Sequence, residues 1–136
     1  MQRMTHLIMA FLTLLLFGFV LTFPIYMAFF AFLGALLPDI DLFSRKMHRK
    51  LCHNIWFLMI VLFVAYSLGV DRTGATIISI GFFSHLISDA LTHKGITPLW
   101  PIKKLKFNGP IKTGGFGEYL LVLVLLLMIY WIGKLI

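Results

Sequence analysis

The residues of this 136-residue chain best suited to chemistry are His85 and Asp89, inside the apolar run from Ala75 to Leu91. Because they are four positions apart, a helix would place both side chains on one face, one turn from each other. An ionisable side chain in such an apolar segment is energetically expensive and by default marks a functional site. A neutral imidazole and a carboxylate are ligands for zinc and similar divalent cations. The pair therefore predicts part of a metal site.

The composition indicates a membrane protein. Hydrophobic residues make up 60% of the chain and charged residues only 12%, whereas a soluble domain carries about 25% charge. We therefore expect one polytopic integral membrane domain over residues 1–136. The apolar N-terminal run lacks a small-residue cleavage site, so we expect it to be retained. Cys52 is the single cysteine, which excludes an intrachain disulfide.

Five apolar segments predict an all-α bundle of five helices. The first, Leu7 to Leu37, would make one helix of roughly 46 Å, longer than a hydrocarbon core of about 30 Å. Pro24 favours a break, which gives a hairpin of Thr5–Leu21 and Pro24–Leu37. Both helices are short, so a shallow or re-entrant hairpin is the alternative. The remaining helices are expected within Leu51–Leu68, Thr73–Leu91 and Glu118–Ile132, with a loop over residues 92–117.

The basic residues predict the orientation of this bundle and its partners. Five alternating spans place ten of the twelve on one side: Arg3, Arg45, Lys46, Arg49, Lys50, Lys94, Lys103, Lys104, Lys106 and Lys112. The positive-inside rule assigns that side, with the N-terminus, to the cytoplasm. The net charge of +7 lies in loops between apolar runs, so it suits anionic lipid headgroups better than nucleic acid. The loops also lack an aromatic platform for bases.

The same alternation brings most polar ionisable residues to the cytoplasmic half, near the ends of helices. These candidates are His6, Asp39, Asp41, His48, His53, His85, Asp89 and Glu118. Together they predict a shared site for one or two divalent ions, zinc first and manganese as the alternative. Individual residues have simpler explanations. Ser84 or Ser88 could satisfy His85, the acids could flank a helix end, and His48 and His93 could be solvated loop residues.

Several stretches resemble one family, the YdjM-type predicted membrane-bound metal-dependent hydrolases. The matching stretches are Leu36-Leu37-Pro38-Asp39-Ile40-Asp41, then His48-Arg49 with His53, then Ser84-His85-Leu86-Ile87-Ser88-Asp89-Ala90-Leu91-Thr92, followed by Gly95 and Leu99-Trp100-Pro101, with early His6 and late Glu118. The family is thought to be distantly related to zinc-dependent phospholipase C and P1-type nucleases. The resemblance implies His85 and Asp89 as ligands, joined by Asp39, Asp41 and His53.

The chain departs from this family at one stretch. The family's His-Arg-Gly-x-Thr-His-Ser reads here as His48-Arg49-Lys50-Leu51-Cys52-His53-Asn54. Both imidazoles are retained, while the hydroxyls that would orient them are replaced. Asn54 offers another hydrogen bond at this position.

These observations favour a membrane-bound enzyme that uses metal-activated water to hydrolyse a phosphoester. The expected substrate is a phospholipid or lipid-linked phosphate. Asp39, Asp41, His53, His85, Asp89 and His6 are the expected metal ligands. Arg49 or a loop lysine is expected to neutralise the phosphate. His48 and Glu118, and His6 if it is not a primary ligand, are expected as acid/base groups or further ligands. Two alternatives remain open: a non-catalytic membrane protein with a structural metal, and a metal transporter or sensor.

Overall fold

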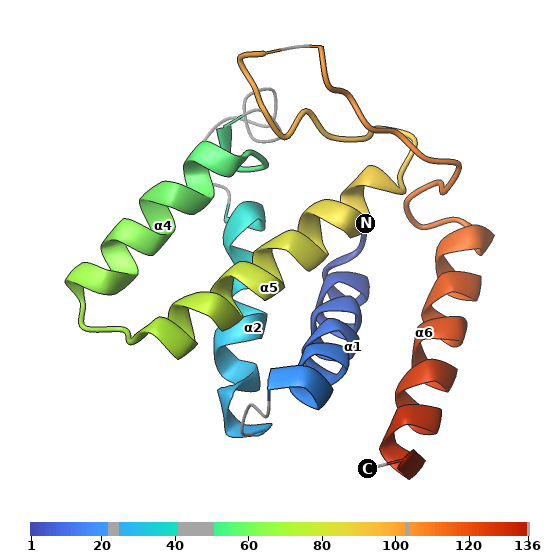
Figure 1. Ribbon diagram of the computed structural model, residues 1–136. Coiled ribbons are helices and arrows are strands. Elements are labelled where there is room, and N and C mark those ends of the chain that lie inside the picture. The colour runs from blue at the N-terminus through green and yellow to red at the C-terminus, as the bar shows by residue number, and fades with distance from the viewer. Residues whose placement is uncertain (22–24, 41–50, 103, 136) are drawn as a thin grey trace.

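Helix α5 (Arg72–Ala90) runs through the centre of a helical bundle in a computed structural model that describes residues 1–21, 25–40, 51–102 and 104–135 (Figure 1). It contacts α1 (Arg3–Leu21), α2 (Ala28–Leu36) and α4 (Ile55–Ser67). Helix α6 (Phe116–Leu135) packs against α1 at the edge of the bundle (Figure 1). Two short 3₁₀ helices, η1 (Ile25–Met27) and η2 (Leu37–Asp39), flank α2. The predicted all-α class is therefore confirmed for the described residues.

The helix ends differ from the sequence predictions by a few residues for local reasons. Asn54 caps α4, accepting a 2.8 Å hydrogen bond from the Phe57 backbone N–H, so the helix begins at Ile55 instead of Leu51. Asp71 caps α5 in the same way through Gly74. Pro24, the predicted break of the first hairpin, lies outside the described residues.

Glycines let α2 and α5 cross in backbone contact. A Cβ at Gly34 would collide with the carbonyl oxygen of Ile78, and one at Gly81 would collide with that of Ala31. Ala31 and Ala35 are fully buried on the same side of α2. Because only a missing side chain permits this approach, the two helices lie close enough for the end of α2 to contact side chains of α5.

The long segment between α5 and α6 is held by backbone pairing. Isolated bridges join Thr92 to Ile111 and Ile96 to Phe107. The second bridge has both hydrogen bonds, 2.8 Å from Ile96 N to Phe107 O and 3.0 Å in the other direction. The predicted loop therefore folds back on itself and lies over the ends of α4 and α5 (Figure 1).

By length and composition, one helix in the described part of the chain, α6, could cross a membrane. The apolar segments Arg3–Gly18, Ala28–Asp39 and Ile55–Ser67 are shorter. Helix α5 has 19 residues, but it carries Ser84, His85, Ser88 and Asp89, which lower its hydropathy. The predicted number of spans stays a prediction.

Candidate metal centre

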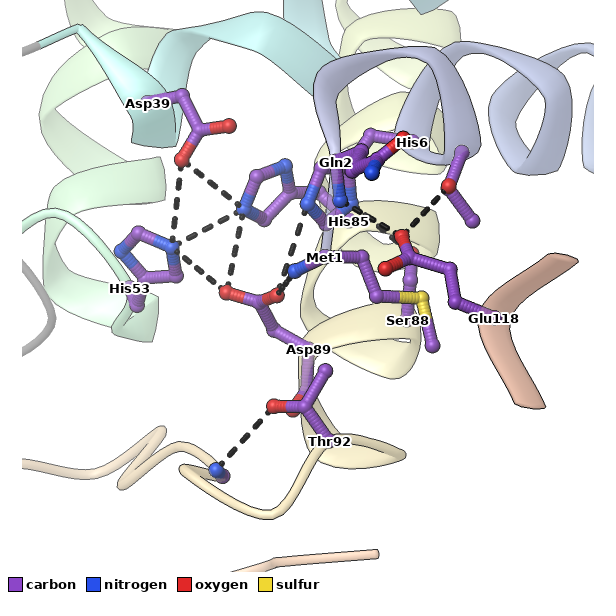
Figure 2. A network of polar contacts seen from close by, with 12 residues as sticks. Met1, Gln2, His6, Asp39, His53, His85, Ser88, Asp89, Thr92 and Glu118 are labelled. Atoms are coloured by element: carbon purple, nitrogen blue, oxygen red, sulfur yellow. Dashed lines mark hydrogen bonds and ion pairs between the residues drawn. The ribbon is translucent and has the colours of Figure 1, made fainter. Parts of the chain in front are cut away.

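Five of the predicted ligands meet at one end of the bundle (Figure 2). They come from four separate segments: His6 from α1, Asp39 from the end of η2, His53 from the residues before α4, and His85 and Asp89 from α5. The predicted ligand Asp41 and the predicted catalytic residues His48 and Arg49 lie outside the described residues. His93, one turn beyond Asp89, is exposed and does not join the group.

The donor atoms of these residues face one another. His53 Nε2 lies 3.0 Å from His85 Nε2 and 3.1 Å from Asp89 Oδ2. His85 Nε2 lies 3.7 Å from the same carboxylate oxygen. Asp39 Oδ1 lies 3.9 Å from both imidazole nitrogens. Four donors from three segments therefore converge on one small volume.

These spacings fit the first coordination sphere of a zinc-like ion. Tetrahedral bonds of about 2.0–2.1 Å place neighbouring ligand atoms about 3.4 Å apart, and the five separations above range from 3.0 to 3.9 Å. Two imidazoles with two carboxylates are also a donor set that zinc accepts. The buried His/Asp groups could therefore hold a metal ion.

The backbone of α2 fixes the tautomer of His85. Its Nδ1–H donates a 2.6 Å hydrogen bond to the carbonyl of Ala35, because a carbonyl can only accept. In the neutral ring this leaves a lone pair on Nε2, the atom that faces His53 and Asp89. In a 3₁₀ helix, each N–H donates to the carbonyl three residues before it. Pro38 in η2 has no N–H, so it cannot donate to the Ala35 carbonyl. The Ala35 carbonyl is consequently left for His85 at the end of α2.

A hydroxyl orients His6 in a similar manner. The Ser88 hydroxyl donates to the Ser84 carbonyl at 2.6 Å, so its oxygen can accept from His6 Nδ1–H at 3.2 Å. The His6 ring stacks on His85 with centroids 3.7 Å apart and an interplanar angle of 16°. His6 Nε2 is buried without a hydrogen-bond partner and lies 3.5 Å from Asp89 Oδ1. A buried imidazole nitrogen without a hydrogen-bond partner, next to a carboxylate, fits the role of a metal ligand.

The donors form two overlapping groups with His85 in common. One contains His6, His85 and Asp89, and the other contains Asp39, His53 and His85. Asp89 also divides its oxygens, with Oδ2 toward His53 and Oδ1 toward His6. The amino nitrogen of Met1 lies 2.5 Å from Asp89 Oδ1 as well. The carboxylate of Asp89 thus lies between the two groups.

The centre is buried except on one side. The side chains of His6, His53, His85 and Asp89 are at most 3% exposed, whereas that of Asp39 is 21% exposed. A molecule that reaches the donors from outside would therefore approach past Asp39.

The third predicted catalytic residue, Glu118, lies apart from these groups and is fully engaged with protein donors. Its Oε1 accepts 2.7 Å hydrogen bonds from the backbone N–H of Gln2 and the hydroxyl of Thr5. Its Oε2 accepts a 2.7 Å bond from Gly114 N–H. We call these four residues the Glu118 clamp. The clamp joins the start of α6 to the end of α1 that carries His6 (Figure 2).

Sequence reasoning missed two of the supporting groups. The hydrogen-bond partner of His85 is the Ala35 carbonyl. The sequence had offered Ser84 or Ser88 as the group that could satisfy this histidine. Ser84 instead donates to the Gly81 carbonyl, and Ser88 is the partner of His6. A backbone carbonyl has no signature in a sequence. The signal that could have been used is Pro38, which removes the local competitor for that carbonyl.

Comparisons with known proteins place the chain in a family. The curated protein YvsG of Bacillus subtilis (strain 168), described as uncharacterized, is 32% identical over 117 residues, which cover 73% of this chain and 72% of that protein. A search of the solved structures finds no match. The family model described as YdjM inner membrane protein matches residues 1–135. The chain therefore belongs to the YdjM inner membrane protein family.

Proposed function

We propose that this chain is a multi-pass membrane enzyme that uses one or two divalent metal ions to hydrolyse a phosphoester. The observation that carries the proposal is the convergence of His53 Nε2, His85 Nε2 and Asp89 Oδ2 within 3.0–3.7 Å, with Asp39 at 3.9 Å. Zinc is the ion that this donor set suits best, and manganese is the alternative.

The number and arrangement of the donors favour hydrolysis. A closed structural site needs four ligands, and here five residues form two overlapping groups. Paired ions in hydrolases of phosphoesters are about 3.5–4 Å apart. Asp89 could bridge such a pair, because its Oδ2 faces His53 and its Oδ1 faces His6. His85, in contrast, has one free ring nitrogen and can bind only one ion. When bound, such ions lower the pKa of a water and neutralise the phosphate.

The residues of the chain hold and orient this chemistry. Ala35 and Ser88 keep the Nε2 atoms of His85 and His6 unprotonated and aimed at the centre. Asp39 lines the accessible side, where a phosphoester would enter. In this proposal Asp41 is a further ligand.

Three residues complete the catalytic machinery in this proposal. Arg49 or a loop lysine neutralises the phosphate, and His48 transfers a proton. Glu118 is the remaining acid/base candidate. Since both of its oxygens already accept hydrogen bonds, its acid/base role requires that one of these bonds opens.

A lipid environment accounts for the exposed surface of the helices. Large apolar side chains such as Met59, Ile60 and Phe63 of α4 and Leu123 and Trp131 of α6 are more than half exposed. Continuous apolar surface of this kind indicates contact with a membrane or a protein. We place the metal centre and the N-terminus on the cytoplasmic side, because ten of the twelve basic residues fall there under five alternating spans.

A structural metal is the second candidate function, favoured by the burial of the centre. The ligands come from four segments, and four of the five side chains are almost inaccessible. An ion there would join α1, η2, α4 and α5, which is the role of a closed structural site.

Elemental analysis of the detergent-purified protein, combined with hydrolysis of a chromogenic phosphodiester, tests the proposal. We expect at least one zinc per chain and metal-dependent turnover, both lost in His85→Ala and Asp89→Ala. The matched control is His93→Ala, because His93 is an exposed histidine four residues beyond Asp89. No bound metal after reconstitution with zinc or manganese would overturn the proposal. One tightly held ion without turnover would instead support the structural role.

A further inference from the structure

An apolar groove of about 280 Å³ lies between α4, α5 and the loop that follows α5. Phe83, Ile87 and Ala90 of α5 form one wall, and Ile96 and Phe107 of the loop form the other. Every side chain that lines the groove is apolar. Phe83 and Ile87 are 45% and 52% exposed, so the groove is open to its surroundings.

The groove is built by ordered backbone contacts. Ile96 and Phe107 pair through two hydrogen bonds, and Ile55 N–H donates to the Pro98 carbonyl at 3.0 Å. The bond from Ile55 attaches the loop wall to the first residue of α4, and the two bonds between Ile96 and Phe107 hold the loop wall together. The shape of the groove therefore depends on backbone pairing, and a change of one lining side chain leaves the pairing in place.

The elements that form the groove also carry the metal centre. Ile87 lies between His85 and Asp89 in the sequence, but it points to another face of α5, because each helical residue turns by about 100°. On the α4 side, the groove residue Ile55 follows the ligand His53 by two positions. The accessible side of the centre is at Asp39, so a lipid whose phosphoester enters there would have to extend its acyl chain past the residues before α4 to reach the groove.

Exposed lysines lie close in the sequence to the residues that line the groove. Lys94 is two residues before Ile96, and Lys106 directly precedes Phe107, so both flank the paired residues of the loop wall. Both lysines and Lys104 are exposed. The loop over residues 92–117 contains no acidic residue. Positive charge beside an apolar groove is complementary to an anionic lipid, which has negative charge next to its acyl chains.

We propose that this groove binds an acyl chain of an anionic phospholipid whose phosphoester is the substrate of the metal centre, an inference that rests on the proposed function. At about 30 Å³ for a water-sized group, the groove holds on the order of nine methylene groups. The lysines bind the headgroup region, and the apolar walls select a long-chain lipid over a water-soluble phosphoester.

Photocrosslinking tests this inference without relying on turnover. Phosphatidylglycerol with a diazirine in the acyl chain is incorporated into nanodiscs with the full chain, and the crosslinked peptides are mapped by mass spectrometry. We expect crosslinks concentrated on residues 83–90, 96–98 and 107, which include most of the residues that line the groove. Ile87→Trp fills the groove and should reduce them about tenfold, the loss expected when two methylene groups no longer fit.

The matched control is Ile60→Trp, the same substitution at a residue of α4 that is 61% exposed and outside the groove. It should leave the groove crosslinks unchanged. Phe107→Ser is the second variant, because it removes part of the wall while the backbone bonds of residue 107 remain; it should also lower the crosslinks.

Three results would overturn the inference: equal crosslinking in Ile87→Trp and wild type, crosslinks spread evenly over α6, or crosslinks between two copies of the chain at the groove. Phosphatidylcholine with the same diazirine should crosslink less, since it lacks net charge, and equal yields would exclude the role of the lysines. Failure of the proposed function can be distinguished from failure of the lipid site. Acyl crosslinks at the groove in a protein that hydrolyses no phosphoester would overturn the enzyme and retain the lipid site.

Discussion

The metal centre and the Glu118 clamp are two buried clusters of ionisable and polar groups, and they differ in how their acceptor atoms are used. Glu118 accepts three hydrogen bonds, all from N–H or O–H donors of the chain. At the metal centre, imidazole nitrogens and carboxylate oxygens face one another at 3.0–3.9 Å. Both clusters contain buried side chains, since Glu118 and His6 are each 1% exposed, although the metal centre also includes the partly exposed Asp39. The difference lies in the partners of the acceptors. Glu118 faces backbone N–H groups and a hydroxyl, whereas the acceptors of the metal centre face other ionisable groups, namely imidazoles, carboxylates and the amino group of Met1.

This difference separates a structural role from a metal-binding one. A buried carboxylate that accepts hydrogen bonds on both oxygens is stabilised where it is and needs no further cation. A cluster of acceptors without enough protons is stabilised by a cation placed among them. Metal binding should therefore depend strongly on the metal centre and hardly at all on the Glu118 clamp. Substitutions should lower metal affinity most at the centre itself, less at its supporting contacts and least in the clamp.

Asp89→Asn should have the largest effect on metal binding. The substitution keeps the shape of the side chain but removes the charge that lies between the two donor groups. Zinc at about 100 times its dissociation constant should stabilise the wild type by about 2.7 kcal/mol and should not stabilise the variant. Thermal unfolding with and without zinc measures the difference.

Asp71→Asn is the control for this experiment. Asp71 caps α5 through Gly74, and asparagine caps a helix as well as aspartate does. Zinc should therefore raise the melting temperature of this variant as much as that of the wild type. Equal stabilisation of Asp89→Asn and Asp71→Asn would show that the bound zinc does not depend on Asp89.

Ser88→Ala should weaken metal binding without abolishing it. The hydroxyl accepts from His6 Nδ1 and orients the ring, and loss of such a supporting contact lowers metal affinity about 10–100-fold. A competition titration with a zinc chelator measures the change. Ser79→Ala is the control, because Ser79 donates only to the Ala75 carbonyl of its own helix. An unchanged affinity in Ser88→Ala would show that the Ser88 hydroxyl does not position a metal ligand.

Gly81→Ala should act on the centre indirectly, through the crossing of α2 and α5. The added Cβ would collide with the Ala31 carbonyl oxygen, so the helices must separate, at a cost of about 1–3 kcal/mol in the free energy of unfolding. The separation moves the Ala35 carbonyl away from His85. Metal affinity should fall by less than in Ser88→Ala, because the ring keeps its other contacts.

Gly18→Ala is the control, because a Cβ at this position of α1 meets nothing within 4 Å. Removing a glycine from the interior of a helix should stabilise the protein by up to about 1 kcal/mol. Metal affinity that is equal in Gly81→Ala and Gly18→Ala would show that the crossing does not position His85.

The core of the metal centre was predictable because its signals are local or follow from helix alternation. His85 and Asp89 share a face through their spacing, and the alternation of helices brought His6, Asp39 and His53 to the same end. The all-α class was also predictable, because it follows from the composition of the chain and its five apolar segments. The membrane spans were harder to predict, because α5 is polar where it carries the ligands and the start of α4 depends on its cap, Asn54.

Which buried acid receives hydrogen bonds from the chain could not be predicted from residue spacing and helix alternation. Glu118 and Asp89 look alike in the sequence, since each is an acid next to an apolar helical run. Their surroundings differ because Gly114 and Gln2 donate backbone N–H groups to Glu118. Such donors depend on the conformation of a loop and of the chain before α1, which hydropathy does not encode.

Glu118→Gln should have the smallest effect on metal affinity and the clearest effect on stability. Glutamine keeps one carbonyl oxygen, so its amide group must face a donor, either Gly114 N–H or the pair of Gln2 N–H and the Thr5 hydroxyl. An unsatisfied buried donor costs about 1–3 kcal/mol, so we expect a lower free energy of unfolding with an unchanged zinc dissociation constant. Thr5→Val, which removes one of the three donors, should cost about 1 kcal/mol. If Glu118→Gln instead retained its stability and zinc but lost hydrolysis, the residue would act on the substrate as an acid/base group, and the contrast between the two clusters would fail at Glu118.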